Sequence, residues 1–150
     1  MIKGLLGLRA QLFILEGKFA SPVHQDFIWD QNGLAVAQCK FCKDDLPRPE
    51  CTCGIFASTN QEVAKIYTST GPSAIVLIEA CGKRQRYTDG WRSEQGYIVA
   101  IVNVPFKAWY GREFGEHEQA TWAACQYWHK PLITLATAQD LIALNWEQHQ

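Results

Sequence analysis

The alternation of hydrophobic and polar positions predicts strands and turns over the first two thirds of the chain. Leu8 to Leu15 is a mixed apolar run suited to a strand. Glu16 to Lys18 is typical of a hairpin turn and leads to a short partner strand over Phe19 to Val23. The strong turn signal Asn32-Gly33 then precedes a further short strand over Leu34 to Gln38.

The strongest strand signal lies in the middle of the chain. Ala74 to Ala80 is almost continuously apolar, which indicates burial on both faces of a sheet. Lys83 to Thr88 is charged and is followed by Asp89-Gly90, a type I′ turn signal that predicts a return strand from Trp91. Tyr97 to Val104 is another strand-like run, rich in β-branched residues.

The apolar spacing becomes helical in the last third. Phe114 to Trp128 carries apolar residues three or four apart, and Thr137 to Asp140 resembles a capping box that opens a helix through about Trp146. Gln61 to Tyr67 predicts a short central helix. We therefore expect an α+β fold with a mainly antiparallel sheet, one short central helix and two C-terminal helices. These two helices are expected to cover one sheet face with Trp122, Trp128, Leu141 and Trp146.

Length and composition fit one domain. The chain has 150 residues, 47% of them hydrophobic, and no linker divides it. We assign 1–150 to a single domain, with the sheet and a metal-binding loop over about 7–104 and a helical tail over about 112–150. The net charge of −1 gives no global field for nucleic acid or membrane. No segment approaches the ~20 apolar residues that span a bilayer, and no secretory signal is present, so we expect a cytoplasmic protein without a membrane partner.

Four of the six cysteines fall in one stretch, at Cys39, Cys42, Cys51 and Cys53. A Cys-x-x-Cys turn directs two thiolates at one ion and Cys-x-Cys supplies two more, which closes a tetrahedral shell at Zn–S ~2.3 Å. The connection Lys43 to Glu50 holds two prolines and two aspartates and predicts a stiff surface loop. Gly54 follows the last cysteine and permits an unusual backbone angle there. The stretch predicts a structural zinc site.

Other chemistry is open to the same cysteines. Two disulfides would need an oxidising compartment, for which the chain shows no secretory signal. An iron–sulfur cluster also uses four cysteines, but the spacing matches neither common ferredoxin run. A redox pair at Cys39 and Cys42 is a further alternative, although two more cysteines nearby favour a shared ion. His24 is close enough in sequence to act as a spare ligand.

Three short segments carry a resemblance to a small uncharacterised domain of bacteria and phages. They are Gly7-Leu-Arg9-Ala10, Cys51-Thr-Cys53-Gly54-Ile-Phe-Ala57 and Gly90-Trp-Arg92-Ser-Glu94. They are similar to that domain's Gly-aromatic-Arg-Ala, Cys-x-Cys-Gly-Ile-Tyr-Ala and Gly-Tyr-Arg-Ala-Glu motifs, and the likeness spans roughly 7–104. The resemblance implies a metal-binding fold with no known activity. In the domain an earlier Cys and a His complete the shell, so Cys39 would match the Cys, and whether Cys42 or a histidine supplies the fourth ligand stays open.

A basic and aromatic cluster lies in the predicted hairpin. Its candidate nucleic-acid contacts are Lys83, Arg84, Arg86, Tyr87, Trp91 and Arg92. Cations would bind phosphates and rings would stack on bases. The alternative is a solvated edge hairpin whose charges discourage strand pairing, with Trp91 pointing into the core.

The remaining reactive side chains form no complete catalytic set. His117, Cys125 and His129 lie on or near the first C-terminal helix. Cys125 and His129 are four apart and could share a metal ion, but Cys125, like Cys81, is expected to be a core thiol. Glu113, Glu116, His117 and Glu118 could include a general base, although a solvated acidic helix start fits them better. The chain has no nucleophile elbow, phosphate loop or His-Glu-x-x-His motif.

Three functional classes follow from these patterns. The leading hypothesis is a non-enzymatic zinc-binding accessory protein that acts through a protein partner, because a shell of four cysteines leaves no open coordination position. The first alternative is a small nucleic-acid-binding protein that uses residues 83–92. The second is a small enzyme with a pocket between the sheet and the C-terminal helices.

Overall fold

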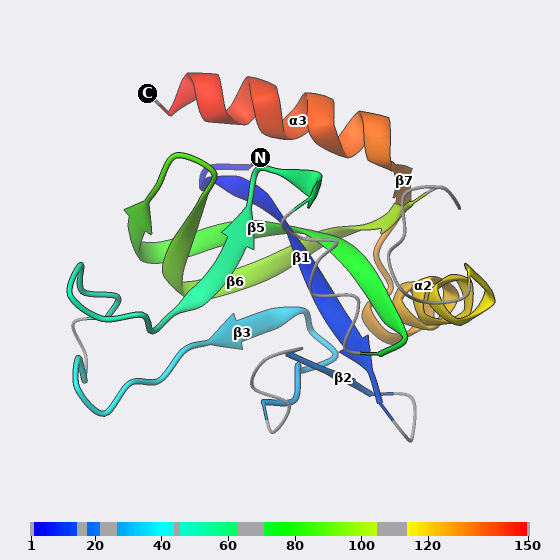
Figure 1. Ribbon diagram of the computed structural model, residues 1–150, viewed down its shortest axis with the longest axis horizontal. Helices are drawn as coiled ribbons and strands as arrows, with labels where there is room; N and C mark the ends of the chain where they lie inside the picture. Colours follow the sequence, from blue (N-terminus) through cyan, green and yellow to red (C-terminus); the bar gives the residue numbers. More distant parts are fainter. Residues whose placement is uncertain are drawn as a thin grey trace.

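The fold is α+β, as the sequence predicts, with a seven-stranded sheet and two C-terminal helices (Figure 1). The computed structural model describes residues 2–14, 18–21, 27–43, 46–62, 71–104 and 114–149. In chain order the elements are β1 (Leu6–Phe13), β2 (Phe19–Ala20), β3 (Leu34–Val36), β4 (Ile55–Ser58), β5 (Ser73–Arg86), β6 (Gly90–Asn103), α2 (Phe114–Trp128), β7 (Leu132–Thr134) and α3 (Leu135–Gln148).

Several predicted features lie partly or wholly outside the described residues. Of the predicted central helix, only Gln61 and Glu62 are described, and both are helical, with the Glu62 N–H donating to Asn60 Oδ1 at 2.9 Å. The Glu16-Gly17 turn, the end of the second predicted strand at residues 22–23, His24 and Glu113 are outside.

Strand pairing bends the sheet into a closed ring. β1 pairs antiparallel with β5, from Leu6 opposite Glu79 to Leu12 opposite Ser73. β5 pairs with β6, β6 with β4, and β4 returns to β1 through the single pair Leu8 and Ser58. β3 joins the same side of β6 as β4, β2 joins β1, and β7 pairs with β6 in parallel.

The central hairpin differs from its prediction at the turn. The Tyr87 N–H donates to the Gly90 carbonyl at 2.8 Å, so Thr88 and Asp89 form the centre of the turn instead of Asp89 and Gly90. Gly90 has a different role, since a Cβ there would lie 2.3 Å from the Ala57 carbonyl oxygen. β6 then continues as one strand through both runs that the sequence predicts separately.

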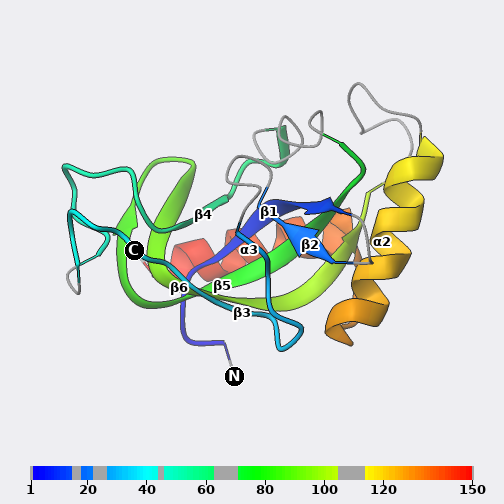
Figure 2. The same cartoon turned by 90° about the horizontal axis from the view of Figure 1, so that it is seen from below.

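The first half of β5, from Ser73 to Ala80, is buried on both faces, as its apolar run predicts, whereas its second half is largely exposed. Ala74, Val76 and Ile78 join the cluster beneath α2, whereas Ile75 and Leu77 join the cluster beneath α3. Successive strand residues point to opposite faces, so the two helices cover opposite faces of the sheet. The prediction that they share one face is therefore wrong. Figure 2 shows α2 beside one end of the sheet and α3 behind β5.

The predicted core residues of the two helices differ in burial. Ala120, Ala124 and Trp128 lie four apart and form the buried side of α2. Trp122 falls on the other side and is 56% exposed, and Leu141 on α3 is 39% exposed. Neither residue is the core contact that the sequence suggests.

α2 has the predicted bounds, but α3 begins earlier than predicted. The Thr137 N–H donates to Thr134 Oγ1 at 3.1 Å, so Thr134 is the N-cap, three residues before the predicted one. Thr134 also ends β7, a strand that the sequence analysis missed. Among the described residues, no helix is long and apolar enough to cross a membrane.

Candidate metal centre

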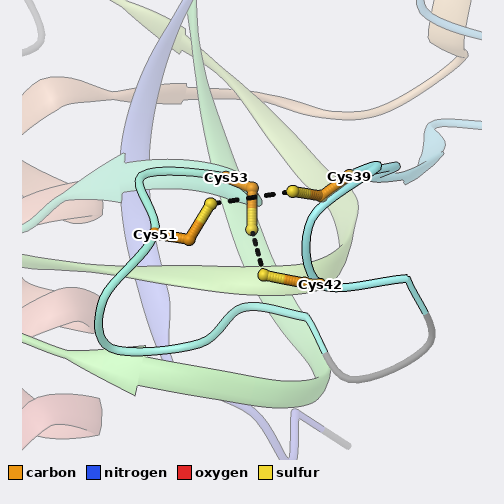
Figure 3. Close-up of side chains that lie close together, drawn as sticks. All are labelled: Cys39, Cys42, Cys51 and Cys53. Atoms are coloured by element: carbon orange, nitrogen blue, oxygen red, sulfur yellow. Dashed lines mark hydrogen bonds between the residues drawn. The ribbon is translucent and has the colours of Figure 1, made fainter.

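Four cysteine sulfurs from two separate segments converge on one point (Figure 3). Sγ of Cys39 lies 3.6 Å from Sγ of Cys51, and Sγ of Cys42 lies 3.5 Å from Sγ of Cys53. All four sulfurs lie within 4.8 Å of one another. A tetrahedral ion with Zn–S bonds of ~2.3 Å separates its sulfurs by about 3.8 Å, which falls inside this range. The cluster is therefore compatible with a metal such as zinc.

The same distances exclude disulfides in this structure. A disulfide brings its sulfurs to about 2.0 Å, whereas the closest pair here is 3.5 Å apart. All six cysteines are free thiols. In the described part of the chain, the four cysteines form the one group of three or more His, Cys, Asp or Glu side chains placed to share an ion.

The sheet brings the two cysteine pairs together. β3 and β4 lie on the same side of β6, where Val36 is opposite Gln95 and Ile55 is opposite Ser93. The end of β3 and the start of β4 are thus neighbours along β6. The first pair of cysteines follows β3 and the second precedes β4, so the strand register sets the approach of the two pairs.

Short turns shape each half of the site. The Lys43 N–H donates to the Cys39 carbonyl at 2.8 Å, and Lys43 has a φ of 53°. The Cys51 N–H donates to the Arg48 carbonyl at 3.1 Å. Gly54 has a φ of 106°, in the region that favours glycine, and a Cβ there would lie 3.0 Å from the Ser93 carbonyl oxygen. The predicted unusual backbone angle at Gly54 is confirmed.

Arg92, on β6, supports residues 48–53, which carry the second cysteine pair and are called the metal segment below. Its side chain is 6% exposed, and its guanidinium donates to the Cys53 carbonyl at 2.6 Å and to the Arg48 carbonyl at 3.2 Å. Its Nε donates to the Tyr87 hydroxyl at 2.5 Å. The planar fork of donors suits this task, because one side chain reaches both carbonyls at once. Arg92 therefore ties the segment around the second cysteine pair to the sheet.

The thiols of Cys39, Cys42 and Cys53 have shifted pKa values, and the shifts differ in direction. A hydrogen bond from the Cys42 backbone N–H lowers the pKa of the Cys39 thiol from 9.0 to about 7, with a smaller contribution from the Cys51 side chain. Burial raises the pKa of the Cys42 thiol. Burial, together with the neighbouring thiols, raises the pKa of Cys53 to about 12. Four thiolates at this spacing would repel one another and lose solvation, and a bound cation would offset both costs.

The six predicted nucleic-acid contacts are not gathered on one surface. The Trp91 ring is fully buried and its Nε1 donates to the Leu6 carbonyl at 3.2 Å, so the core alternative for Trp91 is confirmed. Arg92 is buried at the metal segment, as described above. Arg86 is exposed, but its guanidinium lies 3.8 Å from the centre of the Trp146 ring and donates to the Trp146 carbonyl at 3.3 Å. The exposed members of the set that remain are Lys83, Arg84 and Tyr87.

The other reactive side chains are dispersed. His117 is fully buried, with Nδ1 at 3.2 Å from the Ser73 carbonyl oxygen, whereas His129 is exposed beyond the end of α2. Cys81 and Cys125 are partly buried, and burial raises the pKa of both thiols. A cavity of about 570 Å³ lies between α3 and Thr59, and its titratable lining side chain is Glu147.

The three segments that carry the family resemblance meet at one junction of the sheet. A Cβ on Gly7 would lie 2.8 Å from the Ala57 Cβ, and Gly90 approaches the Ala57 carbonyl in the same way. Nη1 of Arg9 donates to the Phe56 carbonyl at 2.8 Å. Both arginines of the motifs thus bind carbonyls of the Cys51–Ala57 segment. The sequence analysis missed this role, although a glycine precedes each arginine by two positions.

Comparison with known proteins adds no relative to this description. No protein-family model, no curated protein and no solved structure matches the chain.

Proposed function

We propose that this protein is a non-enzymatic accessory module that is stabilised by one zinc ion and acts through a protein partner. The convergence of four cysteine sulfurs within 4.8 Å carries the proposal. Four thiolates fill a tetrahedral shell and leave no position for a substrate or a reactive water, which supports a structural role for the ion. Such an ion would join the end of β3 to the start of β4, in addition to the pairing of both strands with β6 and the Arg92 hydrogen bonds.

The surface beside the cysteines supports a role in protein binding. Leu34, Val36 and Phe41 are 36%, 51% and 62% exposed, and all three lie on β3 or on the segment that leads from it into the cluster. Phe41 stands between the first two cysteines, with the Arg48 guanidinium 5.7 Å from its ring centre. Contiguous exposed apolar patches are typical of interaction sites, and we propose that these three side chains contribute to one.

Metal analysis tests the zinc component. Protein purified without a metal-affinity tag should contain about one zinc per chain, and Cys51→Ser should lose the metal together with thermal stability. Cys81→Ser is the matched control, because this cysteine lies outside the cluster. Iron with visible absorbance, or metal-free protein of unchanged stability, would contradict the proposal.

Affinity capture from the native cell tests the partner component. Wild-type protein should retain a partner after nuclease treatment, and Cys51→Ser should lose it. Capture that disappears with nuclease would favour the nucleic-acid alternative instead. That alternative retains one supporting observation, since Lys83, Arg84 and Tyr87 are each exposed in the β5–β6 hairpin.

A further inference from the structure

β3 is an edge strand with unused hydrogen-bonding groups. It pairs with β6 only (Figure 1). The Ala37 N–H donates to the Glu94 carbonyl and the Ile98 N–H to the Gly33 carbonyl, both at 2.9 Å. This pattern places Leu34 and Val36 at the non-hydrogen-bonded positions of the ladder, so their own N–H and C=O groups point away from β6.

Most of these outward groups are available. The Leu34 N–H is already bound to Asn32 Oδ1 at 2.8 Å. The Val36 N–H and the carbonyls of Leu34 and Val36 have no partner among the described residues. No proline or charged side chain within β3 guards this edge, whereas natural edge strands commonly carry such residues.

The side chains around this edge define what would fit it. Leu34 and Val36 present exposed apolar side chains, while Ala35 between them is buried. A groove of about 730 Å³ continues from Val36 along residues 37–40 to Lys43, Leu46 and Glu94. An extended chain along the edge would place every second side chain against Leu34 and Val36.

The charged side chains that line the groove indicate the charge of the ligand that would fit it. Lys40 and Lys43 both line it and are exposed. Its acidic member, Glu94, already accepts the Lys83 backbone N–H at 2.9 Å. The groove thus offers two ammonium groups to carboxylates of a bound chain.

We propose that β3 and the adjoining groove bind an extended segment of the partner by strand addition, and that this segment alternates apolar and acidic residues. The inference rests on the proposed function and names its site and ligand chemistry. Main-chain hydrogen bonds to Val36 give affinity. Apolar contacts and ion pairs between carboxylates and the two lysines give specificity. Cys39 forms part of the groove wall, so the metal cluster also fixes the shape of the groove.

Fluorescence anisotropy with two labelled peptides tests this proposal. The probes are acetylated and amidated octapeptides, (Val-Glu)₄ and (Val-Lys)₄. We expect the protein to bind the acidic probe at least tenfold more tightly than the basic one. Replacing both Lys40 and Lys43 by Glu should reverse the preference, and Lys18→Glu, an exposed lysine outside the groove, should leave it unchanged.

Val36→Pro is the sharpest variant, because it removes an N–H that points away from β6. Proline is tolerated on an edge strand in that orientation, so the fold and the metal content should be retained. We expect it to weaken binding of the acidic probe at least tenfold, whereas Val36→Thr keeps the N–H and the branched shape and should bind as the wild type does.

The outcomes separate this proposal from the proposed function. If the protein holds zinc and captures a partner, but the acidic probe fails to bind or binds equally to Val36→Pro, strand addition at β3 is overturned and the accessory function stands. A dimer of the wild type that Val36→Pro dissociates would also overturn it, because the edge would then serve a second copy. Absence of both zinc and partner would overturn the proposed function itself.

Discussion

Replacing Arg92 by lysine should loosen the metal segment. The guanidinium joins three acceptors, namely the carbonyls of Cys53 and Arg48 and the Tyr87 hydroxyl. A lysine keeps the charge but brings one compact ammonium group, which cannot bridge the two carbonyls in the same plane. At least one carbonyl beside the cluster then loses its donor.

The structure sets the size of the effect. Arg92 is 6% exposed, so a lost donor is not replaced freely by water. Hydrogen bonds to charged groups contribute about 1.5–3 kcal/mol, and we expect Arg92→Lys to lower the free energy of unfolding by ~2–4 kcal/mol. Loss of a group that orients a metal ligand commonly reduces metal affinity ~10–100-fold, and we expect a decrease of that order for zinc.

Denaturant unfolding and zinc competition with a chromophoric chelator measure these two quantities. Arg84→Lys is the control, since Arg84 lies on the same hairpin and is exposed. The control should match the wild type in both assays. Equal unfolding energies and equal zinc release for Arg92→Lys and Arg84→Lys would refute the role assigned to Arg92.

Four further substitutions test the packing of the sheet and the helices. Trp91→Ala should cost ~3–5 kcal/mol of unfolding free energy because the ring is fully buried, whereas Trp122→Ala should stay within ~0.5 kcal/mol because that ring is 56% exposed; equal costs would contradict the assignment of the core. Gly90→Ala should lower the melting temperature, because its Cβ would meet the Ala57 carbonyl at 2.3 Å, and an unchanged melting temperature would show that β4 can move away. Asn145→Ala should cost ~2–3 kcal/mol in chemical denaturation, since it leaves the Leu6 N–H and the Gly4 carbonyl without partners, and a cost below ~0.5 kcal/mol would mean that α3 docks without them.

The sequence correctly predicts elements whose structure depends on residues that are adjacent in the chain. The periodic run Phe114–Trp128 is a helix with the predicted bounds. Gly33 has a φ of 82° in the predicted turn, where its N–H donates to the Asp30 carbonyl at 3.1 Å. The run Ala74 to Ala80 is part of a strand and is buried on both faces. Each of these predictions depends only on residues that are close together in the sequence.

Features that depend on the path of the chain were not predictable in this way. β7 has three residues and exists because it pairs with β6, a contact between distant segments. The face of the sheet that each helix covers depends on how the chain connects the strands to the helices. Amphipathic spacing says which side of a helix is apolar, but not which sheet face meets it.

The candidate site shows the same division. The spacing of the four cysteines predicted that they would converge, because a Cys-x-x-Cys turn and a Cys-x-Cys segment each place two thiols close together. For Arg92, however, the sequence predicts a contact with nucleic acid instead of a role at the cysteine site. Its position against Cys53 follows from the pairing of β4 with β6, in which Phe56 is opposite Arg92. A basic residue in a hairpin carries no local signal of such burial.

X-ray absorption spectroscopy of the purified full chain tests the central claim most directly, because it reports both the metal and its nearest atoms. The account predicts about one zinc per chain, surrounded by four sulfurs at ~2.3 Å. The four ligands would be Cys39, Cys42, Cys51 and Cys53. A shell that contains nitrogen would show that a histidine replaces one of these cysteines. Iron in place of zinc, or a chain without bound metal, would contradict the claim of a structural zinc centre.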